Sequence, residues 1–222
     1  MKKVVALCIL SIFFGFSGIN DASATPIVLD FEGLGDLEYV EDFYNGGSGT
    51  NYGVEFSSNA MAVIDYDAGG SGNFGGEPTP DTTLFFLEGN AAIMSLSSGF
   101  YSGFSFYYAG YEGGFVDVYD EVGGTGSVLA SFSLPGTEIE GAAADPNGDY
   151  GPFEAIGVSF DGIAKSVAFG GVANQITFDN ITFGSSTPGT GASPIPEPAT
   201  MLLLGSGLLG SAALSRRRRK QG

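Results

Sequence analysis

The sequence predicts an all-β protein whose main domain is an antiparallel β-sandwich of jelly-roll type. Three observations carry this prediction. Between residues 25 and 184, apolar residues recur with period two in short runs. Glycine accounts for 37 of the 222 residues, roughly 17% against a typical ~7%, and it punctuates those runs. Outside the two chain ends, no window shows the i, i+3, i+4 spacing of an amphipathic helix.

Short apolar runs bounded by Gly, Asp, Asn and Pro divide this region into eleven expected strands. Alternate residues share a face, as with Phe104, Phe106 and Tyr108 in one strand and Val167 and Phe169 in another. Such alternation buries one face of a sheet and leaves the other outside. The expected strands are 27–32, 51–57, 62–66, 83–88, 92–97, 103–108, 115–119, 128–134, 154–160, 166–170 and 175–183.

The last expected strand changes phase part-way along. Its apolar residues before Asp179 share one face, whereas those after Asn180 fall on the opposite parity. One extra residue corrects the phase, so we expect a β-bulge at this pair. In sandwiches of this type the first and last strands lie side by side, which would bring Asp30 and Glu32 close to Asp179.

Composition and charge exclude several function classes. The chain has no His and no Trp, and its one cysteine is Cys8. Histidine-assisted nucleophilic catalysis, histidine metal sites and disulfides in the main domain are therefore excluded. Of the 25 acidic residues, 23 lie between Thr25 and Ser193, where Lys165 is the one base, so this stretch carries a charge of about −22. A nucleic-acid partner is excluded because phosphate binding needs a basic surface.

The N-terminal segment 1–24 has the pattern of a secretory signal peptide. Lys2 and Lys3 precede an uncharged apolar run over residues 4–16. Ala22 and Ala24 then supply the small-x-small pattern that signal peptidase requires, so we expect cleavage after Ala24. The domain that follows, residues 25–184, is expected to be exported across the inner membrane.

The C-terminal segment has the pattern of a membrane anchor. A Ser/Thr/Gly linker over 185–194 leads to Ile-Pro-Glu-Pro at 195–198 and an uncharged apolar run over 199–215. The 18 residues between Glu197 and Arg216 give about 27 Å as a helix at ~1.5 Å per residue, enough for one transmembrane helix. The basic cluster at 216–220 stays on the cytoplasmic side and fixes the orientation; its residues are Arg216, Arg217, Arg218, Arg219 and Lys220.

In order and composition, residues 195–220 resemble the PEP-CTERM sorting signal of Gram-negative bacteria. The resemblance implies that an exosortase, an inner-membrane transpeptidase-like enzyme, recognises and cuts near Pro196, Glu197 and Pro198. It also implies a final location at the cell surface or in the extracellular matrix, in association with exopolysaccharide and biofilm. The prolines hold the strip extended and available to a protease, and Glu197 is its one charge.

A second resemblance covers the end of the main domain. Residues 165–171, followed by Phe-Asp-Asn-Ile-Thr-Phe-Gly at 178–184, are similar to the closing strands of PEP-CTERM ectodomains and of carbohydrate-binding jelly rolls. The resemblance implies a jelly-roll-like ectodomain whose first and last strands lie side by side.

Clustered acids suggest Ca²⁺ as a cofactor, because this ion takes six to eight oxygen ligands in tolerant geometry. One candidate site comprises the strand-end acids Asp30, Glu32 and Asp179. The other places Asp145, Asn147 and Asp149 at alternate positions, although Tyr150 and Ile156 stand where an EF-hand loop needs Gly and Glu. The alternative is that these acids are solvated surface.

We therefore expect a surface or matrix protein that is not an enzyme and that binds extracellular polysaccharide. Aromatic rings are the usual sugar platforms, and the candidates are Tyr107, Tyr108, Tyr111 and Tyr119. The alternative is an acidic matrix or coat protein without a specific ligand. A third class, glycoside hydrolysis, needs two paired carboxylates, for which Glu138 and Glu140 are the nearest in sequence.

Overall fold

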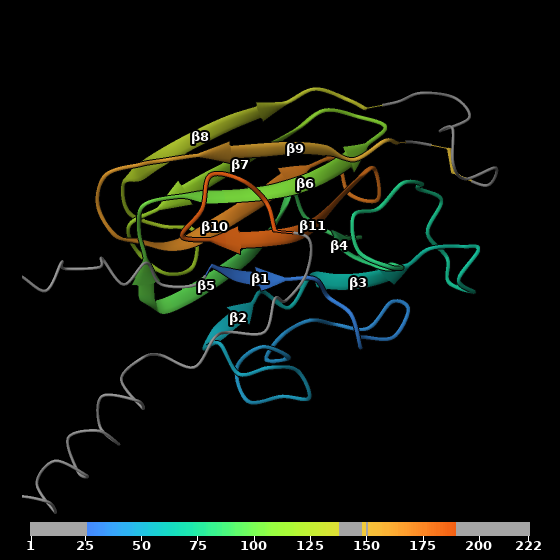
Figure 1. The fold of residues 1–222 in the computed structure, drawn as a ribbon, viewed down its shortest axis with the longest axis horizontal. Helices are drawn as coiled ribbons and strands as arrows, with labels where there is room; N and C mark the ends of the chain where they lie inside the picture. Colours follow the sequence, from blue (N-terminus) through green and yellow to red (C-terminus); the bar gives the residue numbers. More distant parts are fainter. Residues whose placement is uncertain (1–25, 138–147, 150, 190–222) are drawn as a thin grey trace, which may run out of the picture.

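The computed structural model describes residues 26–137, 148–149 and 151–189. These residues contain eleven strands and no α-helix, so the all-β prediction is confirmed for the part of the chain described (Figure 1). No helix in these ranges is long and apolar enough to span a bilayer. The predicted signal peptide and the predicted transmembrane helix both lie outside the described residues.

All eleven expected strands are present, and most ends differ by a few residues from the expected ones. The greatest extension is at β5, which runs on to Phe100, because Ser97–Gly99 continue the strand although they lack apolar side chains. The strands are β1 Ile27–Leu29, β2 Val54–Phe56, β3 Ala60–Ile64, β4 Thr82–Phe86, β5 Ala91–Phe100, β6 Phe104–Gly110, β7 Gly114–Tyr119, β8 Val128–Leu134, β9 Glu154–Val158, β10 Ala164–Gly171 and β11 Ile176–Phe183.

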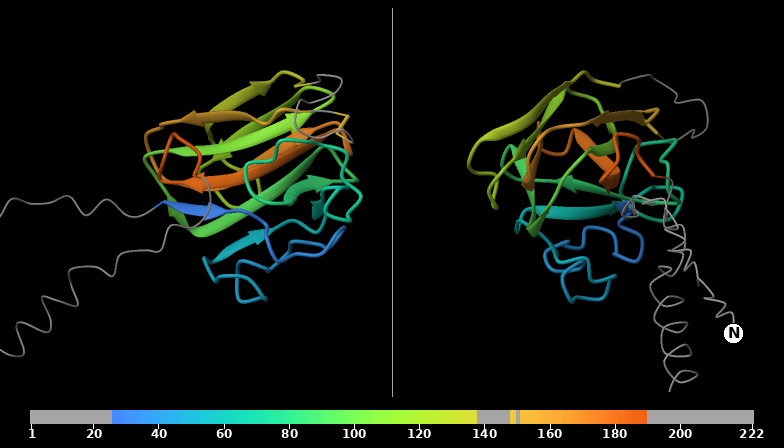
Figure 2. Two further views of the ribbon diagram at one scale, coloured as in Figure 1. Left: turned by 45° about the vertical axis from the view of Figure 1, so that its right-hand side comes forward. Right: turned by 60° about the vertical axis from the view of Figure 1, so that its left-hand side comes forward.

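The strands form two antiparallel sheets. The first has the order β3-β4-β11-β6-β9, with β1 also paired to β11, and the second has the order β2-β5-β10-β7-β8. The predicted neighbourhood of the first and last strands is confirmed, since Leu29 pairs with Ile181 and Ile27 with Phe183. Both sheets combine strands from early and late in the sequence, as the colours in Figure 2 show.

Phenylalanine rings fill the space between the sheets. Phe106 of β6 packs against Phe169 of β10 and Phe178 of β11, and the last two rings lie 5.1 Å apart in an edge-to-face arrangement. All three side chains are fully buried. Burying one such side chain contributes on the order of 1.5–3 kcal/mol, so this core holds the domain together without disulfides.

The predicted bulge is present and lies where β11 changes partner. Phe178 pairs with Leu84 of β4, whereas the residues from Ile181 onward pair with β1. The register with β6 shifts between Asp179 and Thr182. Asn180, at the shift, adopts a φ of 48° in the left-handed region. The bulge therefore brings Asp179 and Asn180 to the junction between β1 and β4.

One margin of the sandwich is covered by the chain itself. The segment between β1 and β2 (blue in Figure 1) runs along the edges of β2 and β3, and we call this side the covered margin. Backbone N–H groups donate across it from Val54 to the Tyr44 carbonyl, from Phe56 to Glu41, from Ala62 to Glu38 and from Val40 to Ala60, at 2.8–3.2 Å. At the opposite side lie β8 and β9, the exposed margin (Figure 1).

The described part of the predicted linker is packed on the sandwich. We call residues 185–189 the strap. The Ser105 hydroxyl donates to the Ser185 carbonyl at 2.9 Å, and Gly189 exchanges hydrogen bonds with Thr182 and Asn180 at 2.9 and 2.7 Å. Residues 185–189, which the sequence analysis assigned to the linker, therefore pack on the sandwich.

Candidate functional site

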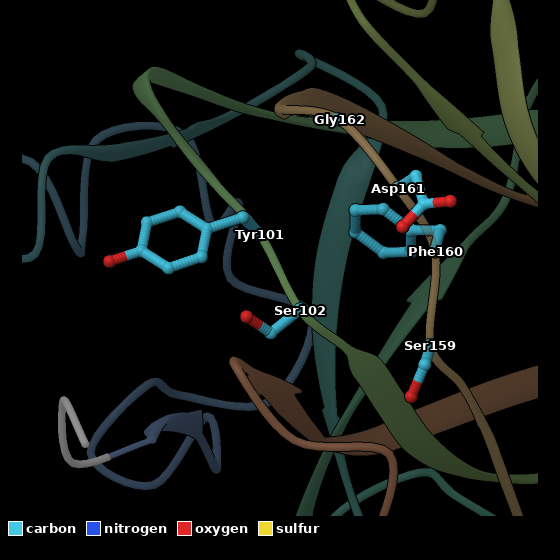
Figure 3. Close-up of a pocket in the computed structure, with 6 residues that line it drawn as sticks. All are labelled: Tyr101, Ser102, Ser159, Phe160, Asp161 and Gly162. Atoms are coloured by element: carbon cyan, nitrogen blue, oxygen red, sulfur yellow. The ribbon is translucent and has the colours of Figure 1, made fainter. Parts of the chain in front are cut away.

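An open depression of about 460 Å³ lies at the end of the sandwich where two turns meet. The β5–β6 turn contributes Tyr101 and Ser102, and the β9–β10 turn contributes Ser159, Phe160, Asp161 and Gly162. Figure 3 shows the Tyr101 ring projecting to one side and the Asp161 carboxylate on the other, with Ser102 between them and Ser159 on the side of Asp161, below Phe160. We call this the Tyr101–Asp161 depression.

Local packing fixes both turns. Gly99 lies directly under Ile163 of the β9–β10 turn, and a Cβ at this position would overlap the Ile163 side chain. The Phe160 ring packs edge-to-face on the buried Phe100 ring, 5.8 Å away, so the floor of the depression is attached to the core. Ser102 has a φ of 77°, a left-handed conformation that costs a non-glycine residue energy and turns the chain sharply.

The lining combines one exposed aromatic ring with polar groups. The Tyr101 side chain is 64% exposed, and its ring is free to receive the apolar face of a ligand. Hydroxyl groups of Ser102 and Ser159 and the Asp161 carboxylate offer hydrogen bonds beside it. Asp161 is the one acid among the described residues that line the depression. A carboxylate pair for glycoside hydrolysis is therefore not part of this lining.

The four tyrosines predicted as platforms are not brought together. Tyr107 and Tyr108 are successive residues of β6 and point to opposite faces of the sheet. Tyr111 is 48% exposed, but it follows β6 at one end of the sandwich, whereas Tyr119 ends β7 in the other sheet at the opposite end.

Tyr108 is unavailable as a platform because its side chain belongs to the core. Its hydroxyl donates to Glu154 Oε2 at 3.2 Å, and burial together with the Glu154 charge raises the pKa of Tyr108 to about 12. Burial and the nearby Asp117 carboxylate likewise raise the pKa of Tyr119.

Sequence reasoning did not single out Tyr101, the exposed ring of this depression. The expected end of the fifth strand at Ser97 left Tyr101 in an unassigned connection, whereas β5 continues to Phe100 and puts Tyr101 at the tip of a tight turn. The sequence did contain a signal for an exposed ring. Tyr101 directly follows Phe100, so alternation turns it away from the face that Phe100 occupies, and Ser-Gly at 102–103 marks a turn immediately after it.

The strand-end acids meet beside a second, more enclosed cavity of about 300 Å³. Asp30 and Glu32 line it together with Tyr44 and Tyr52 from the covered margin. Asp179 lies behind them on β11 and is completely buried. The charges of Asp30 and Asp179 act on each other and both raise the pKa of Tyr44, although burial is the main cause of that shift. The predicted approach of Asp30 to Asp179 is thus observed.

Protein groups already bind two of these carboxylates. Glu32 accepts hydrogen bonds from the backbone N–H groups of Asp81 and Thr82 at 3.1 and 3.0 Å, which fixes the start of β4. Asp179 accepts from the Thr79 hydroxyl at 2.7 Å and from the Asn180 N–H at 2.6 Å. Burial nevertheless raises the pKa of Asp179 well above its usual value and raises that of Asp30.

Within the described ranges, no group of three or more acidic side chains is arranged to hold a metal ion. Glu32 acts instead as a backbone cap, so a ligand set that includes all three strand-end acids is not formed. Of the second candidate set, Asp145 and Asn147 lie outside the described residues. Asp149 accepts a hydrogen bond from Asn73 Nδ2 at 2.8 Å. Glu138 and Glu140 also lie outside the described residues.

The sorting residues lie outside the described part of the structure, and the comparison with known families bears on them directly. The family described as the PEP-CTERM protein-sorting motif matches residues 194–219. This segment is a PEP-CTERM sorting motif. The match begins and ends one residue before the limits that the sequence pattern predicted, and it contains Pro196, Glu197, Pro198 and the Arg cluster. The PEP-CTERM motif implies export and processing by an exosortase.

The sandwich is similar to several solved structures at low identity. One is a family 6 carbohydrate-binding module from Clostridium stercorarium in complex with cellobiose (11% identity, 71% of this chain and 92% of that chain, TM-score 0.36). Another is the K1 cleaved adhesin domain of Lys-gingipain from Porphyromonas gingivalis W83 (14% identity, 72% and 98%, TM-score 0.37).

A third similar structure is a glycoside hydrolase family 43 arabinoxylan arabinofuranohydrolase from Bacillus subtilis (15% identity, 57% of this chain, TM-score 0.37). The chain spans about a quarter of that enzyme's length, since the match covers 24% of it. No curated protein matches the sequence significantly. Likenesses this distant carry no argument about what the chain binds.

Proposed function

We propose that this chain is an exosortase-sorted surface or matrix protein whose β-sandwich binds a neutral extracellular polysaccharide in the Tyr101–Asp161 depression. The observation that carries the binding proposal is the 64% exposed Tyr101 ring beside hydroxyl and carboxylate groups in an open depression. We take the sandwich to be of jelly-roll type, because its last strand lies between strands from early in the sequence.

The chemistry of the depression suits a sugar. The C–H face of a pyranose can stack on Tyr101, while its hydroxyls exchange hydrogen bonds with Ser102, Ser159 and Asp161. The depression is open to solvent and not enclosed, which allows a chain of sugars to pass through. A domain that carries about −22 repels acidic polysaccharides, so we expect a neutral glycan.

Binding is tested with immobilised neutral and acidic polysaccharides. Tyr101→Ala should weaken saturable binding to a neutral glycan about tenfold, as the loss of ~1.4 kcal/mol implies. Tyr66→Ala is the matched control, because Tyr66 is 63% exposed and is not part of the depression. Equal binding by both variants would reject the depression as the site.

Sorting is tested in a host that carries an exosortase. Replacing Pro196, Glu197 and Pro198 together with alanine removes the extended backbone and the one charge of the motif. The variant should remain as an uncut, membrane-retained precursor on immunoblots. Processing at the normal rate would contradict exosortase recognition at this motif.

The alternative is an acidic matrix protein without a specific ligand. The observation that favours it is the high density of acidic residues, which keeps a surface hydrated and soluble. A folded wild-type domain that binds none of the polysaccharides saturably would support this alternative. Hydrolysis of any glycan by the domain would instead support the hydrolase hypothesis.

Ca²⁺ at the β1–β4–β11 junction remains a proposal for Asp30 and Asp179. Within the described residues Lys165 is the one base, and it donates to Glu121 at 3.2 Å. No cationic side chain from the described part of the chain therefore neutralises the junction, and we propose that a proton or an external cation does so. The cavity beside Asp30 gives such an ion access from solvent.

A further inference from the structure

The strap crosses the outer face of the first sheet along a row of four residues. Val28 of β1 lies opposite Thr182 of β11. Thr182 also lies opposite Ser105 of β6, which in turn lies opposite Gly157 of β9. Ser105 stands between two core phenylalanines on its strand, so this row points away from the core. Ser105 and Thr182 are nevertheless almost completely buried, because the strap lies over them.

The sheet holds the strap by its backbone. The Ser105 hydroxyl donates to the Ser185 carbonyl, and the Asn180 side-chain amide donates to the Gly189 carbonyl. The Gly189 N–H donates to the Thr182 hydroxyl. The three side chains that bind the strap are all almost completely buried, and a buried polar group without a partner is costly. The sheet therefore favours the docked strap.

The two turns that form the depression begin where strand pairing stops. The last pair of β6 and β9 at this end is Phe104 with Val158. Ser102 and Ser159 lie beyond it, so the hydrogen bonds of the ladder do not reach them. Other contacts must therefore hold the two serines at a constant spacing.

The strap supplies such contacts on the β6 side. The N–H of Gly184, directly before the strap, donates to the Gly103 carbonyl at 2.8 Å. A Cβ on Gly103 would lie 2.8 Å from the Ser185 carbonyl carbon, so the strap packs tightly on this residue. Gly103 follows Ser102, whose left-handed conformation persists only where its surroundings fix it.

The strap supplies contacts on the β9 side as well. A Cβ on Gly157 would overlap the Ser186 carbonyl, so the strap backbone touches β9 two residues before Ser159. The Thr187 N–H donates to the Ser185 hydroxyl at 3.1 Å and closes a turn within the strap. One short, turned segment thus contacts the chain next to both serines of the depression.

We propose that the docked strap is a positioning element of the polysaccharide site, because it holds Ser102 and Ser159 at the spacing that a bound sugar requires. The inference rests on the proposed polysaccharide binding. No described residue of the strap lines the depression, so the strap acts through the two serines and does not touch the ligand. A site that is ordered before binding loses less entropy when the ligand binds. By linkage, a bound polysaccharide favours the docked strap to the same extent.

Hydrogen exchange of the full chain in detergent tests the positioning without any ligand. Thr182→Val removes the hydroxyl that accepts the Gly189 N–H. Amide exchange in segments 101–103 and 159–162 should quicken about three- to tenfold, the range that the loss of one hydrogen bond implies. Thr182→Ser keeps the hydroxyl and should exchange as the wild type does. Unchanged exchange in both turns of a folded Thr182→Val protein would overturn the inference.

A second variant displaces the strap at its other end. Gly157→Ala puts a methyl group where the Ser186 carbonyl lies, whereas Gly35→Ala meets only the end of the Glu38 side chain. Gly157→Ala should therefore quicken exchange in segment 101–103, and Gly35→Ala should not. Far-ultraviolet circular dichroism checks that both variants keep their sheet. Equal exchange in this segment of the two folded variants would also overturn the inference.

Binding to soluble dextran, laminarin and hydroxyethylcellulose, three neutral polysaccharides, gives the functional readout. Thr182→Val should bind about three- to tenfold more weakly than the wild type, and Thr182→Ser should bind equally well. The bound polymer should slow exchange in the strap of the wild type but not of Tyr101→Ala, an effect that a merely structural strap would not show. Equal affinity of the wild type and Thr182→Val would overturn the inference alone. A wild type that binds none of the three polymers would reject the proposed function together with it.

Discussion

The two margins of the sandwich reach stability by different means. The covered margin relies on a long connection that folds over β2 and β3, and it places three non-glycine residues in left-handed conformations: Phe31, Leu37 and Glu41, with φ values of 58°, 60° and 37°. The exposed margin contains β8, which the sequence predicts with its observed bounds. The difference shows that the energetic cost of a left-handed backbone is tolerated where buried rings and hydrogen bonds offset it. A regular strand such as β8 has no such cost to offset.

Removing the central ring of the covered margin should have the largest effect on stability. Tyr44 is buried against Phe31 and Phe43, and its hydroxyl accepts the Phe31 N–H at 2.7 Å. Tyr44→Ala should lower the free energy of unfolding by about 3–5 kcal/mol, the range for buried aromatic truncations. Phe132→Ala on β8 should cost about half as much, because that side chain is half-buried. Urea unfolding of residues 25–189 measures the free energy of unfolding of both variants. Equal losses would show that the two margins do not differ in how much one ring contributes to stability.

Ca²⁺ should stabilise the junction that anchors the covered margin to β11. A cation bound only by the folded state, at about 100 times its dissociation constant, adds about 2.7 kcal/mol. Asp179→Ala should abolish most of this gain, while Lys165→Ala should leave it intact, because Lys165 pairs with Glu121. The measurement is the melting temperature in EDTA, in Ca²⁺ and in NaCl of matched ionic strength. Identical values in Ca²⁺ and NaCl would reject a specific site.

The same junction should make stability fall as pH rises in the absence of divalent ions. Burial raises the pKa of Asp179 above its usual value of 3.8, so the folded state holds this proton more tightly than the unfolded state. The stabilisation is complete below pH 3.8 and is lost as pH rises through the folded-state pKa. Asp179→Asn cannot ionise, so its stability should decline less than that of the wild type over this window. Parallel pH profiles of the two proteins would contradict the assignment.

The smallest expected effect tests the backbone strain directly. Leu37 is 43% exposed with a φ of 60°, and glycine adopts this conformation without steric cost, so Leu37→Gly should stabilise the domain by up to about 1 kcal/mol. Leu87 is 44% exposed and its φ is not positive. Leu87→Gly should therefore destabilise the domain, and thermal unfolding compares the two. A loss of stability in Leu37→Gly equal to that in Leu87→Gly would show that the loop is not strained.

The sequence predicted the strands better than it predicted what surrounds them. Alternating hydrophobicity identified all eleven strands, and the parity change at Asp179 located the bulge, because both depend on local period alone. The covered margin was missed, since backbone bonds such as Val54 to Tyr44 depend on tertiary position and leave no periodic signal. The strap was missed for the same reason.

The predicted tyrosine cluster was based on closeness in sequence, which is not closeness in space. Tyr107 and Tyr108 are adjacent in the chain, yet a strand turns them to opposite faces. Tyr101 and Asp161 are far apart in the chain, yet the pairing of β5 with β10 and of β6 with β9 brings their turns together. The strand-end acids were located correctly because the pairing of the first and last strands could be anticipated.

The strap limits how far the sandwich can lie from the sorting motif. From Gly189, the last residue of the strap, seven residue steps lead to Pro196, and a fully extended chain covers at most about 25 Å in that distance at ~3.6 Å per residue. A tether that began at Gly184 would reach about 43 Å. In the membrane-anchored precursor that we propose, docking of the strap would keep the sandwich within about 25 Å of the Pro-Glu-Pro motif that the exosortase would cut.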